Sequence, residues 1–314
     1  METSRPVFKQ LDHVIARVDD PGALFRLLTR KLGLPVAWPF KSYPSFQSGG
    51  VALGNLYLEI MQCGRRRPPE GGGRFCAVAF EVAPIAEAVR ELSRRRIPHT
   101  PAVPYVERGA NGERAALWSN AVLGRLIGRD FLLDATIALS RLPGAARLSD
   151  SGSGRALDRW QLDLLLRRGI AFLCEFHYEN FGERPHWSEF GNHEQKRAHD
   201  LAELRARGGG AVGVESVKEV LVGVKDFAAA RDLWRRLYAP AAERAEGVWE
   251  TDDGPAVRLV AAPSDSIQTL ALKVSSLERA ETFLRESGML GSVGEAHITI
   301  DPSKLEGLDL RLVA

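Results

Sequence analysis

The segment that decides the fold begins with Leu11-Asp12-His13-Val14-Ile15-Ala16-Arg17-Val18. These residues favour a strand, and Asp19-Asp20-Pro21-Gly22 then interrupts it. Apolar residues from 23 to 32 recur at the spacing of one helix face, with Asp20 as the expected N-cap and Gly33 as the expected C-cap. Three further strands are expected at residues 45–48, 51–53 and 57–62. The segment therefore predicts a β-α-β-β-β unit.

The same order of elements returns three times along the chain. Strands are expected at residues 75–82, 218–224 and 267–274, and a helix pattern follows each of them. The last two copies close with strands expected at residues 256–261 and 308–313. Because each unit carries several strands and only one helix, the repeat does not favour a solenoid.

The second copy is longer than the others. Its closing strand is expected only at residues 170–178, after a helical insertion over about 120–168 with helices at 120–142 and 157–168. These helices either cover a cleft or join two copies of the chain in a homodimer, and the sequence leaves both open. Residues 179–207, rich in charge and histidine, are interpreted as a solvated connector that is helical from 193. The predicted units are 1–185, a connector at 186–213, and 214–314.

Composition limits the classes of function. The chain has 314 residues, enough for about two domains of ordinary size. Its formal net charge of +2 gives no sign of a nucleic-acid partner or an acidic membrane surface. Three cysteines without a CxxC pair favour a reducing compartment. The start lacks a signal-peptide pattern, and the longest apolar stretch, 131–142, is too short to span a membrane. We therefore expect a cytoplasmic protein.

The opening unit resembles the vicinal oxygen chelate superfamily, which includes glyoxalases, bleomycin-resistance proteins and extradiol dioxygenases. The resemblance rests on Leu11-Asp12-His13-Val14, on Lys31-Leu32-Gly33-Leu34, and on residues 46–60, FQSGGVALGNLYLEI. It covers residues 8–62 and extends to the other copies by self-similarity. It implies an α+β fold of four βαβββ modules, paired into two glyoxalase-like domains whose sheets curl around a cleft.

The resemblance also implies a divalent metal ion held by the first and last strands of paired modules. In the first module the ligand positions match His13 and Glu59. In the second they fall on Ala77, which cannot coordinate, and near Glu175, with His177 two residues further on the same strand face. The C-terminal modules offer Glu219 with Arg258 and Thr269 with Arg311, so that half is expected to be free of metal.

A set of His13, Glu59 and Glu175 would leave positions on the ion open for water or substrate. This set implies a metal-dependent lyase, isomerase or dioxygenase, in which Glu59 or Glu175 could instead transfer a proton. Other expected contacts to a small organic ligand are His177, Tyr57, Phe46 and Trp118. The alternative is a metal-free protein that binds or sequesters a ligand in the same cleft, with His13 as a hydrogen-bonded core residue.

Overall fold

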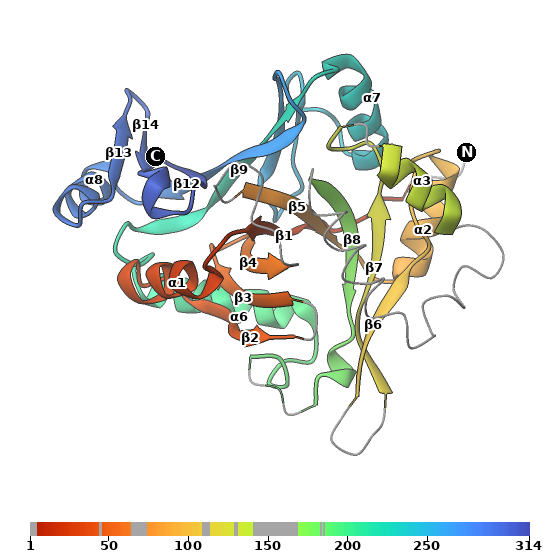
Figure 1. Ribbon diagram of the computed structural model, residues 1–314, viewed down its shortest axis with the longest axis horizontal. Helices are drawn as coiled ribbons and strands as arrows, with labels where there is room; N and C mark the ends of the chain where they lie inside the picture. The colour runs from red at the N-terminus through yellow and green to blue at the C-terminus, as the bar shows by residue number, and fades with distance from the viewer. Residues whose placement is uncertain are drawn as a thin grey trace.

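The computed structural model describes residues 5–43, 46–63, 74–108, 114–128, 131–140, 169–182, 184 and 186–314. These residues form two curled mixed sheets flanked by helices (Figure 1). The strand order is β2-β3-β4-β1-β5-β8-β7-β6 in the first sheet and β10-β11-β9-β12-β15-β14-β13 in the second. The predicted α+β fold of paired modules is confirmed.

Two modules build the first sheet. The first module consists of β1 (Gln10–Arg17), α1 (Pro21–Arg26), the π-helical turn η1 (Leu27–Lys31), β2 (Val36–Ser42), β3 (Phe46–Ala52) and β4 (Tyr57–Cys63). The second consists of β5 (Arg74–Glu81), α2 (Ile85–Arg94), β6 (Val103–Arg108), β7 (Arg114–Leu123), α3 (Phe131–Ser140) and β8 (Ile170–Phe176). The caps expected for the first helix are present, because Asp20 accepts a hydrogen bond from the Ala23 amide and Gly33 has a φ of 72°.

The second sheet follows a short 3-10 turn, η2 (Tyr178–Asn180), and helix α6 (His193–Ala206). Its third module consists of β9 (Val214–Val224), α7 (Phe227–Tyr238), β10 (Val248–Trp249) and β11 (Ala256–Ala261). The fourth consists of β12 (Ser266–Val274), α8 (Leu277–Glu286), β13 (Leu290–Val293), β14 (His297–Ile300), the turn η3 (Pro302–Lys304) and β15 (Asp309–Val313). The third module departs from the predicted pattern, since only two strands follow its helix.

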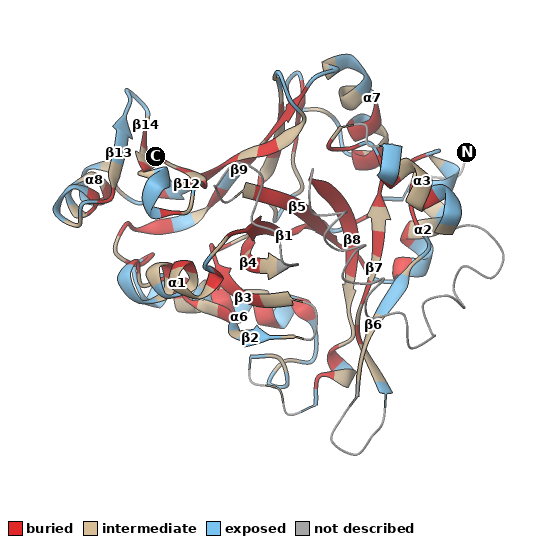
Figure 2. Cartoon of the chain, viewed as in Figure 1, coloured by how far each residue is buried: buried red, intermediate tan, exposed pale blue. Residues whose placement is uncertain are grey.

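Each sheet has a helix face and an inner face. On the helix face of the first sheet, apolar residues such as Val14 and Phe80 pack into one core with residues of the second sheet, among them Val220 and Trp234. The central strands β1, β5 and β8 are almost entirely buried (Figure 2). The inner face of the first sheet carries a separate cluster made of Ile15, Met61, Cys76, Ala77, Ala79, Phe172 and Cys174. The helix face therefore belongs to the core that both sheets share, and the inner face carries a cluster of its own.

The insertion differs from its prediction at its start. Residues 120–123 continue strand β7 instead of beginning a helix, and burial alternates along this strand with the period of two that a sheet requires. Helix α3 packs Leu133 and Ile137 against the inner-face cluster, while Phe131 remains 83% exposed. The second predicted helix, 157–168, lies outside the described residues. The described part of the insertion thus covers part of the inner face.

The connector is not the solvated segment that its charge suggested. Helix α6 begins where predicted, and Asn192 caps it by accepting a hydrogen bond from the Gln195 amide. Its residues His193, Lys196 and Asp200 are nevertheless buried. They face β1, β4 and β2, which places α6 beside the N-terminal module (Figure 1). No helix within the described ranges is long and apolar enough to cross a membrane.

Candidate active site

Strand register shows which residues hold equivalent positions in the two modules of the first sheet. Strands β1 and β5 are antiparallel, with His13 opposite Ala79 and Ile15 opposite Ala77. These two pairs are related by a local two-fold axis between the strands. The axis places Ala77 at the position equivalent to His13, and Ala79 at the position equivalent to Ile15. The predicted equivalence of these two positions is confirmed.

The last strands of the two modules can be compared in the same way. Strand β4 runs parallel to β1 and sets Glu59 beside Ile15, while β8 runs parallel to β5 and sets Phe172 beside Ala79. Because Ala79 is the counterpart of Ile15, Phe172 is the counterpart of Glu59. The second module therefore presents alanine and phenylalanine where the first presents histidine and glutamate.

His13 and Glu59 converge on the inner face. Nε2 of His13 lies 3.5 Å from Oε2 of Glu59, and the two side chains are 6% and 13% exposed. The Ser48 hydroxyl donates a hydrogen bond to Glu59. Burial raises the pKa of Glu59. Burial opposes a charged His13, but the hydrogen bond to Asp12 and the charges of Asp12 and Glu59 outweigh it and raise the pKa of His13. The two groups form an ion pair when His13 is protonated.

Glu175 and His177 do not join this pair, contrary to expectation. Phe172 and Cys174 of β8 lie on the inner face, so Glu175 points to the helix face. There its Oε2 accepts a hydrogen bond from the Ile85 amide at the start of α2. His177 lies 2.9 Å from the Ser119 hydroxyl through Nε2. Glu175 lies three residues after Phe172, the counterpart of Glu59. A shift by an odd number of residues turns a side chain to the opposite face of the sheet.

The aromatic residues expected near the ligand lie on the inner face. Phe46 and Trp118 are half-buried and pack against the inner-face cluster. Phe46 stacks on Tyr43 with ring centroids 4.5 Å apart, and Trp118 stacks on Tyr105 at 4.2 Å. Together these rings form a half-buried aromatic group next to the inner-face cluster.

Tyr57 lies deeper than these aromatic side chains. It is 2% exposed, and its hydroxyl donates to Asp200 at 2.8 Å. Lys196 is fully buried and donates to the same Asp200 oxygen at 2.5 Å and to the Ala37 carbonyl at 2.8 Å. Helix α6 therefore positions Tyr57 through the buried ion pair between Lys196 and Asp200.

Asp12 is the main residue that sequence analysis missed. A register shift between Leu11 and His13 in the β1–β5 pairing lets both Asp12 and His13 face inward. Oδ2 of Asp12 lies 2.6 Å from Nδ1 of His13, and its Oδ1 lies 2.5 Å from Nε2 of His193. Arg197 donates to the same Oδ1 at 3.1 Å. Burial opposes ionisation of Asp12, but His193 and His13 outweigh it and hold its pKa well below the ordinary value.

The contribution of α6 had a detectable signal in the sequence. The residues that reach the site, His193, Lys196, Arg197 and Asp200, follow the spacing i, i+3, i+4 and i+7 of one helix face. A polar stripe of this kind also occurs on solvated helices. What distinguishes it here is that the chain brings it against the buried Asp12 and Tyr57.

The ligand set that the resemblance implies is not assembled by the described residues. His13 and Glu59 supply two ligand atoms, whereas a catalytic metal site commonly uses three protein ligands. The equivalent positions in the second module, Ala77 and Phe172, supply none. We therefore assign no chemical step to an ion at this position.

A different group could hold a metal ion. Asp12, Glu81 and His193 are buried, and one ligand atom from each lies within 4.8 Å of the others. These atoms already have partners, because Asp12 bonds to His193 and Arg197 and Gln10 donates to Glu81 at 2.8 Å. An ion would have to replace the bond between Asp12 and His193 and lie close to a guanidinium.

No family model and no curated protein matches the sequence. Solved structures match at the level of architecture. All of the chain aligns with 74% of an extradiol ring-cleaving dioxygenase from B. fuscum, at 8% identity and a TM-score of 0.53. All of it also aligns with 93% of the 2,3-dioxygenase LapB from Pseudomonas sp. KL28, at 11% identity and a TM-score of 0.51.

A hypothetical protein from Staphylococcus aureus matches 96% of the chain over 97% of its own length, at 9% identity and a TM-score of 0.53. The chain therefore shares the overall fold of these proteins. At these identities the likeness concerns the fold alone, so activity has to be argued from the residues of this chain.

Proposed function

We propose that the inner face of the first sheet binds a small organic molecule and that His13 and Glu59 transfer a proton to or from it. The observation that carries this proposal is the approach of Nε2 of His13 to Oε2 of Glu59, 3.5 Å apart beside half-buried aromatic side chains. Proton transfer of this kind belongs to lyase or isomerase chemistry.

The roles of the two residues follow from their hydrogen bonds. Asp12 accepts from Nδ1 of His13, which fixes the imidazole ring and directs Nε2 toward Glu59. A carboxylate with a raised pKa is a suitable proton acceptor near neutral pH. The protonated imidazole beside it stabilises negative charge on a substrate oxygen.

The surroundings favour an aromatic or planar ligand. Phe46 and Trp118 offer ring faces that are partly exposed. Trp38 donates to the Ser48 hydroxyl at 3.4 Å, and Ser48 in turn contacts Glu59. A ligand with neighbouring oxygen atoms would combine ring stacking with hydrogen bonds to His13 and Glu59.

A second candidate function is a metal-dependent lyase, isomerase or dioxygenase, the class first implied by the superfamily resemblance. The observation that favours it is the group Asp12, Glu81 and His193, with three ligand atoms within 4.8 Å. A bound divalent ion would there stabilise charge on a substrate oxygen.

Calorimetric titration with catechol, a small aromatic molecule with adjacent hydroxyl groups, tests both candidates in buffer with and without EDTA. We expect binding in EDTA and a loss of about tenfold in affinity for Glu59→Gln, because a hydrogen bond to a charged group is removed. Glu175→Gln on the helix face is the matched control and should bind as the wild type does.

Two outcomes would contradict the proposal. Equal catechol affinity of Glu59→Gln and Glu175→Gln would show that catechol does not bind beside Glu59 on the inner face. Binding that disappears in EDTA and returns with added Mn²⁺ would favour the metal-dependent candidate. Elemental analysis of Glu81→Gln would then show whether the ion depends on the group that includes Asp12.

A further inference from the structure

The inner face of the second sheet has its own arrangement of charged residues. Strand β9 is antiparallel to β12, with Glu219 opposite Ala271 and Leu221 opposite Thr269, so Thr269 is the counterpart of Glu219. In the same way, Arg258 beside Leu221 and Arg311 beside Ala271 are counterparts. Both arginines therefore stand where Glu59 stands in the first sheet, and guanidinium groups replace its carboxylate.

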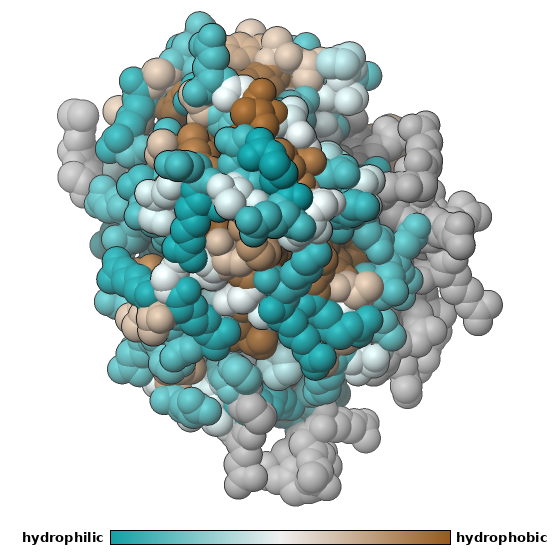
Figure 3. All heavy atoms as spheres, turned by 90° about the vertical axis from the view of Figure 1, so that its left-hand side faces the viewer, coloured by the Kyte–Doolittle hydropathy of each residue, from teal (hydrophilic) through white to brown (hydrophobic). Residues whose placement is uncertain are grey.

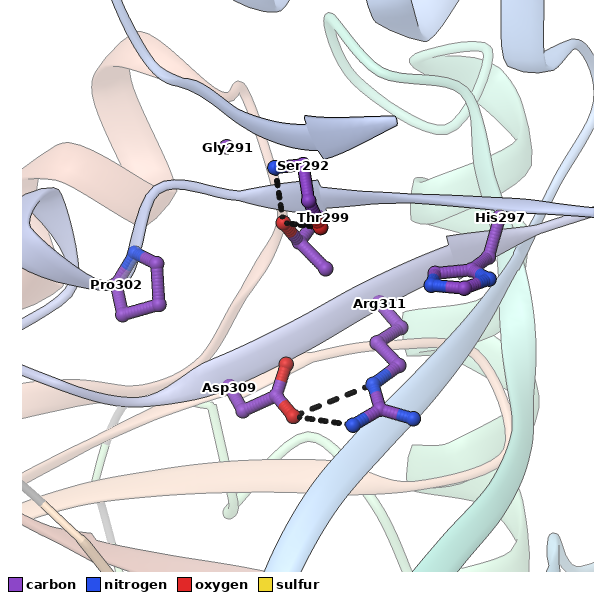
Figure 4. A pocket seen from close by; sticks show the side chains of 7 residues that line it. All are labelled: Gly291, Ser292, His297, Thr299, Pro302, Asp309 and Arg311. Atoms are coloured by element: carbon purple, nitrogen blue, oxygen red, sulfur yellow. Dashed lines mark hydrogen bonds and ion pairs between the residues drawn. The ribbon is translucent and has the colours of Figure 1, made fainter. Parts of the chain in front are cut away.

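Arg311 is held in a defined orientation. Its Nε and Nη2 donate to Oδ2 of Asp309 at 3.2 and 2.9 Å. The hydroxyl of Thr269, a fully buried residue, donates to the same Oδ2 at 2.6 Å. The close view shows the third guanidinium nitrogen directed away from Asp309 (Figure 4). The ion pair thus fixes the guanidinium and leaves one of its nitrogen atoms, Nη1, available to a ligand.

An open pocket of about 470 Å³ surrounds this ion pair. Strands β13, β14 and β15 and the turn after β14 line it with Gly291, Ser292, His297, Thr299, Pro302, Asp309 and Arg311 (Figure 4). The side chains of Arg311 and Asp309 are 39% and 30% exposed. The side of the molecule that carries α8 and the fourth module is mainly hydrophilic (Figure 3). Polar and charged side chains among the lining residues, above all those of Arg311 and Asp309, offer hydrogen-bonding groups to a small ligand.

We propose that this pocket is a second binding site, specific for a small hydroxy acid. The carboxylate of the ligand accepts a hydrogen bond from Nη1 of Arg311, while the Ser292 hydroxyl keeps its bond to Thr299 on the opposite wall. The three hydrogen bonds accepted by Asp309 all end on Oδ2, so Oδ1 accepts one from the hydroxyl of the ligand. The site combines a donor for the acid with an acceptor for the hydroxyl.

The pairing with Asp309 explains why this ligand class is favoured over a simple anion. Asp309 forms an ion pair with Arg311, so an anion that offers charge alone gains little long-range attraction there. A carboxylate instead uses the directed N–H donor that remains on the guanidinium. The adjacent hydroxyl adds selectivity, because an analogue without it leaves Asp309 Oδ1 without that hydrogen bond.

Isothermal titration calorimetry with L-malate tests the proposal on the full chain. Succinate, which is malate without its hydroxyl, and inorganic phosphate are the comparison ligands. We expect succinate to bind about tenfold more weakly than malate, and phosphate to bind no better than succinate. Arg311→Gln should lower malate affinity at least about tenfold, since it removes the charged donor.

Arg258→Gln is the matched control, because Arg258 is the counterpart of Arg311 but does not line the pocket. It should leave malate binding unchanged. Equal losses in the two variants, or equal affinity for malate and succinate, would overturn the proposal, as would the absence of malate binding at millimolar concentration. Catechol binding by Arg311→Gln shows that the variant is folded, and separates failure here from failure at His13 and Glu59.

Discussion

The two sheets share a fold but hold their charged residues under different conditions. In the first sheet Asp12 is fully buried and contacts His13, His193 and Arg197. In the second, Glu219 pairs with Arg258 at 2.7 Å while their side chains are 20% and 43% exposed. Burial makes the interactions of the first sheet costly to break, whereas water screens those of the second.

The difference comes from what covers each inner face. Helix α6 places His193, Lys196 and Asp200 over the first sheet, and α3 adds Leu133 and Ile137. Around Arg311 the pocket is open to solvent. Equivalent strand positions therefore hold a buried histidine–glutamate pair in one half and partly exposed pairs of arginine with an acidic residue in the other.

The largest expected effect is the loss of the Asp12 carboxylate. Asp12→Ala leaves His13, His193 and Arg197 without their common acceptor, so we expect unfolding to require about 3–5 kcal/mol less free energy. Urea denaturation at neutral pH measures this difference. Asp12→Asn keeps an oxygen acceptor and should lose less unfolding free energy. An equal loss in both variants would indicate that the carboxylate's charge, and not the hydrogen-bond acceptor alone, stabilises the fold.

The same network should make stability depend on pH. The pKa of Asp12 is lowered on folding, so its contribution is fully present above its ordinary value of 3.8 and is lost as pH falls through the folded value. The pKa of His13 is raised, so its contribution is present below 6.5 and is lost as pH rises through the folded value. The pKa of Glu59 is also raised, so its contribution to stability is present below 4.5 and is lost as pH rises through the folded value.

We therefore expect stability to be greatest between pH 3.8 and 4.5. It should fall below this window as the contribution of Asp12 is lost, and above it as the contributions of Glu59 and, from pH 6.5, His13 are lost. Urea denaturation of the wild type from below pH 3.8 to above pH 6.5 measures this dependence. Asp12→Ala is the control, because the variant lacks both the acid and the partner of His13. A variant whose stability follows the wild-type pH profile would show that other groups cause the dependence.

A smaller loss is expected for the contact between the first sheet and α6. Tyr57→Phe removes the hydrogen bond to Asp200 but leaves the bond from Lys196, so we expect a loss of about 1.5 kcal/mol. Thermal or urea unfolding checks this value. Tyr105→Phe removes a hydrogen bond to Glu107 at a half-buried tyrosine, where water can replace it, and should lose about 0.5 kcal/mol or less. An equal effect at both positions would contradict the special role of α6.

The smallest effect belongs to the second sheet. Glu219→Ala breaks the exposed pair with Arg258, and we expect a change in unfolding free energy of about 0–1 kcal/mol that shrinks in high salt. Denaturation at low and high salt measures both. A loss as large as that of Asp12→Ala would show that burial does not separate the two sheets.

Local signals predicted most of the elements. The helix start at Asp20 follows from a side chain that caps the first turn, and Asp20 accepts the expected hydrogen bond. Asp226 and Ser276 cap α7 and α8 in the same way. The pairing of His13 with Glu59 followed from the superfamily resemblance. The register of β8 did not, because an insertion precedes the strand and nearly all of its residues are buried, so hydrophobicity does not reveal which of them face inward.

The sequence by itself determined the repeated modules, since their alternation of strand and helix patterns and their caps act between neighbouring residues. Only the tertiary structure decided that Phe172 takes the strand position expected for Glu175, that a register shift turns Asp12 inward, and that the polar face of α6 is buried. These outcomes depend on contacts between distant segments. A one-residue shift changes every such contact while leaving the local pattern intact.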